Sequence, residues 1–158
     1  MQAPQVKTAE NGKLIALSGD LNRFVFTGEE TSGRCAQWEA ILPPGGGPPV
    51  HLHRREDETV RVLAGEVTAR IGDQTVILQQ GSSAYLPIGV PHGFTNHSQH
   101  ETRVLFIAVP AGIENFFFET GVEVAPGEAP PEAFSDEEKQ RIKKRAAVYG
   151  IEFLGGKI

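Results

Sequence analysis

Four residues with metal-binding side chains lie in two short segments of the chain. His51 and His53 are separated by one residue, and Glu58 follows five residues after His53. Alternate side chains of an extended strand leave the same face, so His51 and His53 can contact one ion together. His92 lies on a later segment that has the character of a strand. Each of these residues alone is weak evidence, but their combination favours a metal site.

Short apolar segments separated by turn residues would form the scaffold of such a site. Trp38, Ala40 and Leu42 alternate with polar residues, which is the pattern of a half-buried strand. The proline- and glycine-rich stretch 43–49 interrupts the series and predicts a loop. The strands we expect span residues 13–17, 22–26, 35–42, 59–63, 66–71, 75–78, 84–87 and 102–109.

The character of the chain changes after Pro110. Apolar residues recur at near-helical spacing within 113–120 and predict a short helix. Ser135 followed by Glu138 has the form of a capping box, so we expect a second helix from about residue 136 to residue 148. These patterns together predict an all-β chain with a C-terminal α-helical segment.

Composition and charge restrict the partners of this chain. The formal net charge is −5 and no basic block precedes the C-terminal segment, which argues against nucleic acid as a partner. No stretch approaches the roughly 18 to 20 apolar residues that cross a bilayer, so we expect no membrane association and a cytoplasmic location. Cys35 is the only cysteine, which excludes an intramolecular disulfide and a cysteine-based zinc site.

Two patterns around the candidate ligands match a known family. The chain reads G-x5-H-x-H-x4-E-x6-G from Gly45 to Gly65 and G-x5-P-x-G-x2-H-x3-N from Gly81 to Asn96, with fifteen residues between the patterns. Both patterns closely resemble the two conserved motifs of the cupin superfamily. Beyond them, the segments GEETSGRCAQWEAILPPGGGPPVHLHRREDE and AAVYGIEFL look like small single-domain cupins described as quercetin-dioxygenase-like.

The resemblance implies a fold and a site. It implies a jelly-roll β-barrel with one metal ion near its centre, held by His51, His53, Glu58 and His92. We therefore expect residues 1–158 to form a single cupin domain, with a barrel core at about 12–110 and a helical C-terminal extension at about 111–158. Relatives of this type usually bury an outer sheet face by dimerisation, so we also expect a homodimer.

The ligand set suits several metals and several reactions. Three imidazoles and one carboxylate bind divalent iron, manganese, nickel, copper or zinc, and ligand identity does not choose among them. Four protein ligands on an octahedral ion leave two adjacent positions open, which favours a dioxygenase acting on an enol, catechol-like or flavonol-like small molecule. Glu58 can act as catalytic acid and base or as a ligand only. An oxygen-independent isomerase or lyase and a non-catalytic binding module remain alternatives.

Other side chains are assigned to the pocket or to the surface. Trp38, Tyr85, Phe94 and Phe106 are candidates for an apolar substrate pocket, although core packing is the commoner role of such residues. Arg61 stands where many relatives carry an aromatic residue, and it faces outward if Glu58 faces inward. The remaining histidines, His97 and His100, lie in a polar run, and we expect them at the surface.

Overall fold

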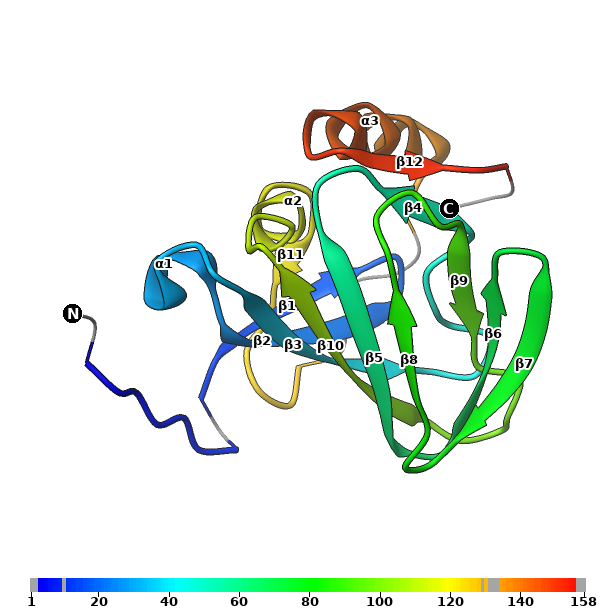
Figure 1. Ribbon diagram of the computed structural model, residues 1–158, viewed down its shortest axis with the longest axis horizontal. Coiled ribbons are helices and arrows are strands. Elements are labelled where there is room, and N and C mark those ends of the chain that lie inside the picture. The colour runs from blue at the N-terminus through cyan, green and yellow to red at the C-terminus, as the bar shows by residue number, and fades with distance from the viewer. Residues whose placement is uncertain (1–2, 10, 129, 131–133, 156–158) are drawn as a thin grey trace.

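The computed structural model describes residues 3–9, 11–128, 130 and 134–155, and all the strands of these residues lie in two antiparallel sheets. The larger sheet has the strand order β11 (Val122–Glu123), β1 (Lys13–Leu17), β2 (Asp20–Phe26), β3 (Ala36–Leu42), β10 (Thr102–Val109), β5 (Asp57–Ala64) and β8 (Ser83–Leu86). The smaller sheet has the order β12 (Ile151–Phe153), β4 (His51–His53), β9 (His92–Thr95), β6 (Glu66–Ile71) and β7 (Gln74–Gln79). The two sheets curve around a shared interior (Figure 1), and the predicted jelly-roll barrel is confirmed.

Strand alternation fills that interior with apolar side chains. The ring of Trp38 on β3 stacks on Phe106 of the neighbouring β10, with ring centroids 5.2 Å apart and planes 11° apart. Phe94 from β9 of the opposite sheet meets Phe106 edge to face at 5.6 Å. Such aromatic pairs add about 0.5–1.5 kcal/mol each beyond the area they bury. One aromatic cluster therefore joins the two sheets near the candidate ligands.

The loop at residues 43–49 adds backbone contacts to the smaller sheet. The amide of Phe94 donates to the carbonyl of Pro48 at 3.0 Å, and the amide of Gly45 donates to the carbonyl of Asn96 at 2.7 Å. Gly47 has a φ of 122°, and a Cβ there would lie 2.3 Å from the Phe94 carbonyl oxygen. Glycine is therefore required for the loop to approach β9 this closely. The loop leads directly into β4, so these contacts position His51.

Helices lie along the upper and left margins of the two sheets in Figure 1. They are α1 (Gly28–Thr31), α2 (Glu114–Thr120) and α3 (Asp136–Val148). The predicted capping box is confirmed, because Ser135 Oγ accepts a hydrogen bond from the Glu138 amide at 3.3 Å and Glu138 accepts from the Ser135 amide at 2.8 Å. None of the helices in the described part of the chain has the length and apolar character needed to span a membrane.

The C-terminal segment is not only helical. β11 pairs with β1, and β12 pairs with β4 so that Ile151 lies opposite His53 and Phe153 opposite His51. The extension after residue 110 therefore contains two short strands in addition to the expected helices. These strands are two and three residues long, too short for a periodic pattern to reveal them. β12 thereby brings the end of the described chain against β4, the strand that carries two candidate ligands.

Candidate metal centre

Three strands direct the four candidate ligands toward one point. His51 and His53 occupy alternate positions of β4, and His51 lies directly opposite His92 of β9. Glu58 reaches the same point from β5 in the other sheet, and all four residues are at most 7% exposed. The strand alternation expected from the sequence aligns His51 with His53, while the pairing of β4 with β9 and the position of β5 in the other sheet bring His92 and Glu58 to the same place.

The distances between the side-chain atoms are short. His51 Nε2 lies 3.1 Å from His53 Nε2, and ligand atoms of His51, His53 and His92 all lie within 4.8 Å of one another. The Glu58 carboxylate lies beside them, with Oε2 3.3 Å from His53 Nε2 and Oε1 3.9 Å from His92 Nε2. One carboxylate and three imidazoles thus surround a space of the size that a metal ion takes between its ligands.

The other ring nitrogen of each histidine is held by an acceptor. Nδ1 of His51 contacts the Pro49 carbonyl at 2.8 Å, Nδ1 of His53 contacts Glu56 Oε1 at 2.8 Å, and Nδ1 of His92 contacts the Val90 carbonyl at 2.9 Å. Since these acceptors need a proton on Nδ1, they leave the Nε2 lone pairs of neutral rings free for a metal ion. Nε2 of His92 is buried and, within the described residues, has no hydrogen-bond partner.

The electrostatics of the cluster differ from one histidine to the next. Burial lowers the pKa of His51 well below its usual range, and the charges of His92 and His53 lower it further. Burial also lowers the pKa of His92, against the opposing charge of Glu58. Burial would lower the pKa of His53 as well, but hydrogen bonds and charges from Glu56 and Glu58 outweigh it and raise that pKa to about 9. At His53 a metal cation therefore competes with a proton.

Glu56 is a site residue that the sequence analysis missed. Residues 54–57 have the polar character of an exposed turn, but Glu56 is only 3% exposed because its carboxylate bonds the buried Nδ1 of His53. Carboxylate acceptors on metal-binding histidines fix the ring and increase its basicity. In the sequence, the only indication of this role is that Glu56 follows the candidate ligand His53 by three residues.

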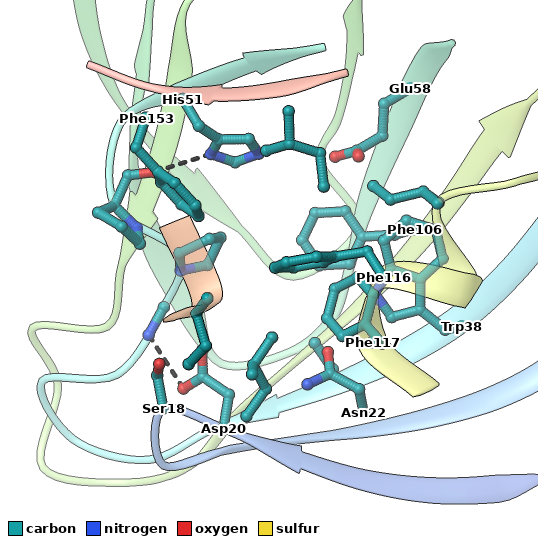
Figure 2. A pocket seen from close by; sticks show the side chains of 18 of the residues that line it. Ser18, Asp20, Asn22, Trp38, His51, Glu58, Phe106, Phe116, Phe117 and Phe153 are labelled. Carbon is teal, nitrogen blue, oxygen red and sulfur yellow. Dashed lines mark hydrogen bonds between the residues drawn. The ribbon is translucent and has the colours of Figure 1, made fainter. Parts of the chain in front are cut away.

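A cavity of about 90 Å³ adjoins the cluster (Figure 2). His51, His53 and Glu58 form part of its wall. Most of the remaining wall is apolar and includes Trp38, Phe106, Phe116, Phe117, Ile151 and Phe153. Trp38 and Phe106 thus lie where the sequence analysis placed them, whereas Phe116 and Phe117 of α2 were not assigned to the pocket.

Two predicted pocket residues lie elsewhere. Tyr85 is 59% exposed and lies opposite the exposed Thr59 of β5. Because Glu58 faces the interior opposite Leu86, alternation turns Tyr85 to the outer face, and its assignment to the pocket is wrong. Phe94 is buried but packs in the core, with its ring centroid 6.1 Å from His92 and 5.6 Å from Phe106.

The surface predictions are confirmed. Arg61 is exposed on the outer face of β5, where its guanidinium donates to Ser83 Oγ at 3.3 Å. His97 and His100 are both exposed. These two histidines therefore stand apart from the buried cluster.

Comparison with known proteins identifies the fold family. Residues 38–108 match the family model described as Cupin domain. The chain carries a cupin domain. The matched residues run from β3 to β10 and include all four members of the buried cluster.

The chain is similar to one curated protein and to many solved structures. It is 28% identical over 146 residues to quercetin 2,3-dioxygenase of Bacillus subtilis (strain 168), which covers 87% of this chain and 43% of that protein. The chain thus spans less than half the length of this curated relative.

Solved structures share the fold at lower identity. An RmlC-like cupin from Shewanella frigidimarina has a TM-score of 0.61 at 19% identity, covering 73% of this chain and 99% of that one. A predicted oxalate decarboxylase from Thermotoga maritima has a TM-score of 0.62 at 18% identity, covering 68% of this chain and 99% of that one. At such identities these neighbours support the cupin fold alone.

Proposed function

We propose that this cupin is a metal-dependent dioxygenase. In this proposal His51, His53, Glu58 and His92 hold one divalent transition-metal ion, and the substrate is an enol, catechol-like or flavonol-like small molecule. The observation that carries the proposal is the convergence of three buried imidazoles and one carboxylate beside a cavity with aromatic walls, which His51, His53 and Glu58 help to line. The similarity to a quercetin 2,3-dioxygenase supports the reaction class.

The donor set fits a metal ion. Imidazole and carboxylate groups suit divalent iron, manganese, nickel, copper and zinc. A buried His92 Nε2 without a partner in the described residues is costly for the protein, and an ion would satisfy it. The three Nδ1 contacts supply the outer hydrogen bonds that metal-binding histidines ordinarily have.

The protein's own residues have separate tasks in this scheme. A bound ion would supply Lewis acidity and, if it is redox-active, a route for electrons between substrate and dioxygen. The rings of Trp38 and Phe106 lie parallel to each other at the cavity wall and would orient a flat substrate. The apolar wall also excludes water from the reacting atoms.

Glu58 is the residue we propose for proton transfer. Its Oε2 is 3.3 Å from His53 Nε2 and its side chain lines the cavity, so it lies where a substrate hydroxyl would bind beside the ion. A carboxylate at this place can take the proton of an enol hydroxyl as the substrate binds. If Glu58 is a ligand only, Glu58→Gln lowers metal content and leaves the pH profile of turnover by the remaining loaded protein unchanged.

The volume of the cavity limits the size of the substrate molecule. A single water needs about 10 to 15 Å³ of such space, so this cavity has room for roughly six waters. That space corresponds to a molecule of one or two rings. The substrate panel should therefore test enols and catechols of one or two rings first and three-ring flavonols afterwards.

The test is oxygen consumption by the metal-loaded protein with this panel. Separate samples carry iron, manganese, nickel, copper or zinc, and the His51→Ala variant serves as the site control. Oxygen uptake with product formation in the wild type, lost in the variant, is the expected result. Turnover without oxygen would instead assign an isomerase or lyase, and tight binding without any product would assign a binding module.

We also infer one folding unit that forms homodimers. Ile142 of α3 and Ile151 of β12 belong to the same hydrophobic core as Trp38, which supports a single domain. Large apolar side chains on the outer face of the larger sheet, including Tyr85 at 59% and Val109 at 50%, are exposed in the single chain and support a dimer. The mass in solution, measured by light scattering, tests it, and a monomer at micromolar concentration would contradict it.

A further inference from the structure

A second polar group lies at the far end of the cavity from the candidate metal centre. Asp20 and Asn22 of β2 line the cavity, together with Ser18 of the turn before β2 (Figure 2). In Figure 2 His51 and Glu58 lie at the top of the view and these three residues at the bottom, with aromatic side chains that include Phe106 and Phe116 at intermediate height. The cavity thus has two polar ends and an apolar middle.

Both side chains of this second group are more than nine-tenths buried. Asp20 is 8% exposed and Asn22 is 5% exposed. Oδ1 of Asp20 accepts a hydrogen bond from the Gly47 amide at 3.1 Å. Within the part of the chain that the structure describes, no hydrogen bond is formed by Asp20 Oδ2 or by the side-chain amide of Asn22, and these atoms are not sealed in the core but belong to side chains that line the cavity.

Polar atoms on a cavity wall that have no partner in the protein are available to a ligand, which can replace the water that they otherwise contact. Burial raises the pKa of Asp20 to about 7, against the opposing hydrogen bond from Gly47. The carboxyl is therefore present in both protonation states near neutral pH, and it can accept or donate a hydrogen bond.

The local backbone holds this group against the cavity. Ser18 and Gly19 form the two-residue turn of the β1–β2 hairpin with φ values of 53° and 91°, so Asp20 begins the next strand opposite Leu17. The loop at Gly46 closes over the carboxyl, since a Cβ at Gly46 would lie 2.5 Å from Asp20 Oδ1. The position of Asp20 therefore depends on the hairpin and on the loop that leads to β4.

We propose that Asp20 and Asn22 form a second subsite that binds a hydroxyl group at the end of the substrate remote from the metal. This inference rests on the proposed function and makes it more specific. The substrate class becomes a flat enol or catechol whose opposite end carries a hydroxyl. Its chelating oxygens bind at the histidine cluster, its rings lie along the aromatic wall, and its hydroxyl meets Asp20 and Asn22.

A purely structural role for Asp20 makes a different prediction. Holding the loop at Gly47 requires only Oδ1, and the Asp20→Asn variant keeps an oxygen for that hydrogen bond. In that case the variants would alter stability without altering the choice between ligands. The ratio of affinities for two ligands that differ only in the distal hydroxyl therefore distinguishes a structural role of Asp20 from a role in ligand binding.

The experiment uses two pairs of chelating enols that differ only in the distal hydroxyl. The short pair is kojic acid and its deoxy analogue allomaltol, and the long pair is 3,4′-dihydroxyflavone and 3-hydroxyflavone. Dissociation constants are measured by calorimetry with zinc-loaded protein, because zinc has no redox chemistry and the probes then bind without oxidation. The variants are Asp20→Ala, Asp20→Asn and Asn22→Ala, with Asp73→Asn in the exposed β6–β7 turn as the matched control.

The wild type and the control variant are expected to bind the hydroxylated member of at least one pair about tenfold more tightly, as one hydrogen bond to a charged group provides. Asp20→Ala should reduce this preference to less than about threefold while the other member keeps its affinity, whereas Asp20→Asn keeps an amide donor and should retain part of the preference. Equal affinities within both pairs in the wild type, or a preference that survives Asp20→Ala, would overturn the subsite alone. If neither pair binds in a zinc-dependent way, the proposed function fails and this inference fails with it.

Discussion

Replacing Asp20 by asparagine should change how the stability of the protein depends on pH. The folded protein holds the pKa of Asp20 at about 7, compared with an ordinary value of 3.8. Between these values the folded state keeps a proton that the unfolded state releases, so the free energy of unfolding falls as pH rises. The asparagine side chain of the variant does not titrate, and its oxygen can still accept the Gly47 hydrogen bond.

The magnitude follows from the width of that interval. Each pH unit between the unfolded and folded pKa values is worth about 1.4 kcal/mol, so the whole interval is worth at most about 4 kcal/mol. Contact of the carboxyl with the cavity reduces this figure, and we expect about 2 kcal/mol. The variant should therefore gain about that amount relative to the wild type between about pH 4.5 and about pH 8.

The assay is urea unfolding of both proteins, at equal metal content, at several pH values across this interval. The other titratable groups lining the described cavity are His51, His53 and Glu58, and their titration cancels in the difference between the wild type and the variant if the sites do not couple. Asp73→Asn, at an exposed turn, provides the control for loss of a carboxylate. A difference that is independent of pH, or one that increasingly favours the wild type at high pH, would refute the reasoning.

Three further substitutions test other parts of the structure. Glu56→Ala removes the acceptor on His53 Nδ1 and should weaken zinc affinity about 10- to 100-fold in a chelator competition; an unchanged affinity would contradict this role. Gly93→Ala places a Cβ 2.9 Å from the backbone of the loop before β4 and should cost about 1–3 kcal/mol in urea unfolding, whereas a neutral result would show that the loop can move away. Ser135→Ala removes the α3 cap and should cost about 1 kcal/mol; thermal melting that matches the wild type would show that the cap contributes nothing.

The pairing of His51 and His53 could be predicted from sequence because a local rule governs it, whereas the addition of Glu58 and His92 depended on the resemblance to the cupin motifs. The spacing of His51 and His53 by one residue places both on one face of any strand, and this remains true in β4. The capping pattern at Ser135 likewise depends only on residues within one helical turn. Local signals of this kind persist in the folded protein because packing does not have to override them.

Other features depend on contacts between distant segments. Glu56 looks like a surface residue until His53 supplies a buried partner for it. Tyr85 was placed on the wrong face because nothing within its short strand fixes which face is inside; the pairing of Leu86 with Glu58 decides it. Asp20 joins the cavity only because the loop at Gly47 closes over it, 27 residues away in sequence.

The central claim is that four residues of this cupin hold a metal ion. The direct measurement is the metal content of protein purified without added metal or chelating resin, determined by elemental mass spectrometry. It is made for the wild type and for the His51→Ala, His53→Ala and His92→Ala variants. His97→Ala is the matched control, since His97 is exposed and lies outside the cluster. We predict close to one transition-metal ion per chain in the wild type and the control, and little in the other three. A wild type that carries no metal and takes up none on loading, or a His92→Ala variant that keeps a full equivalent, would contradict the account.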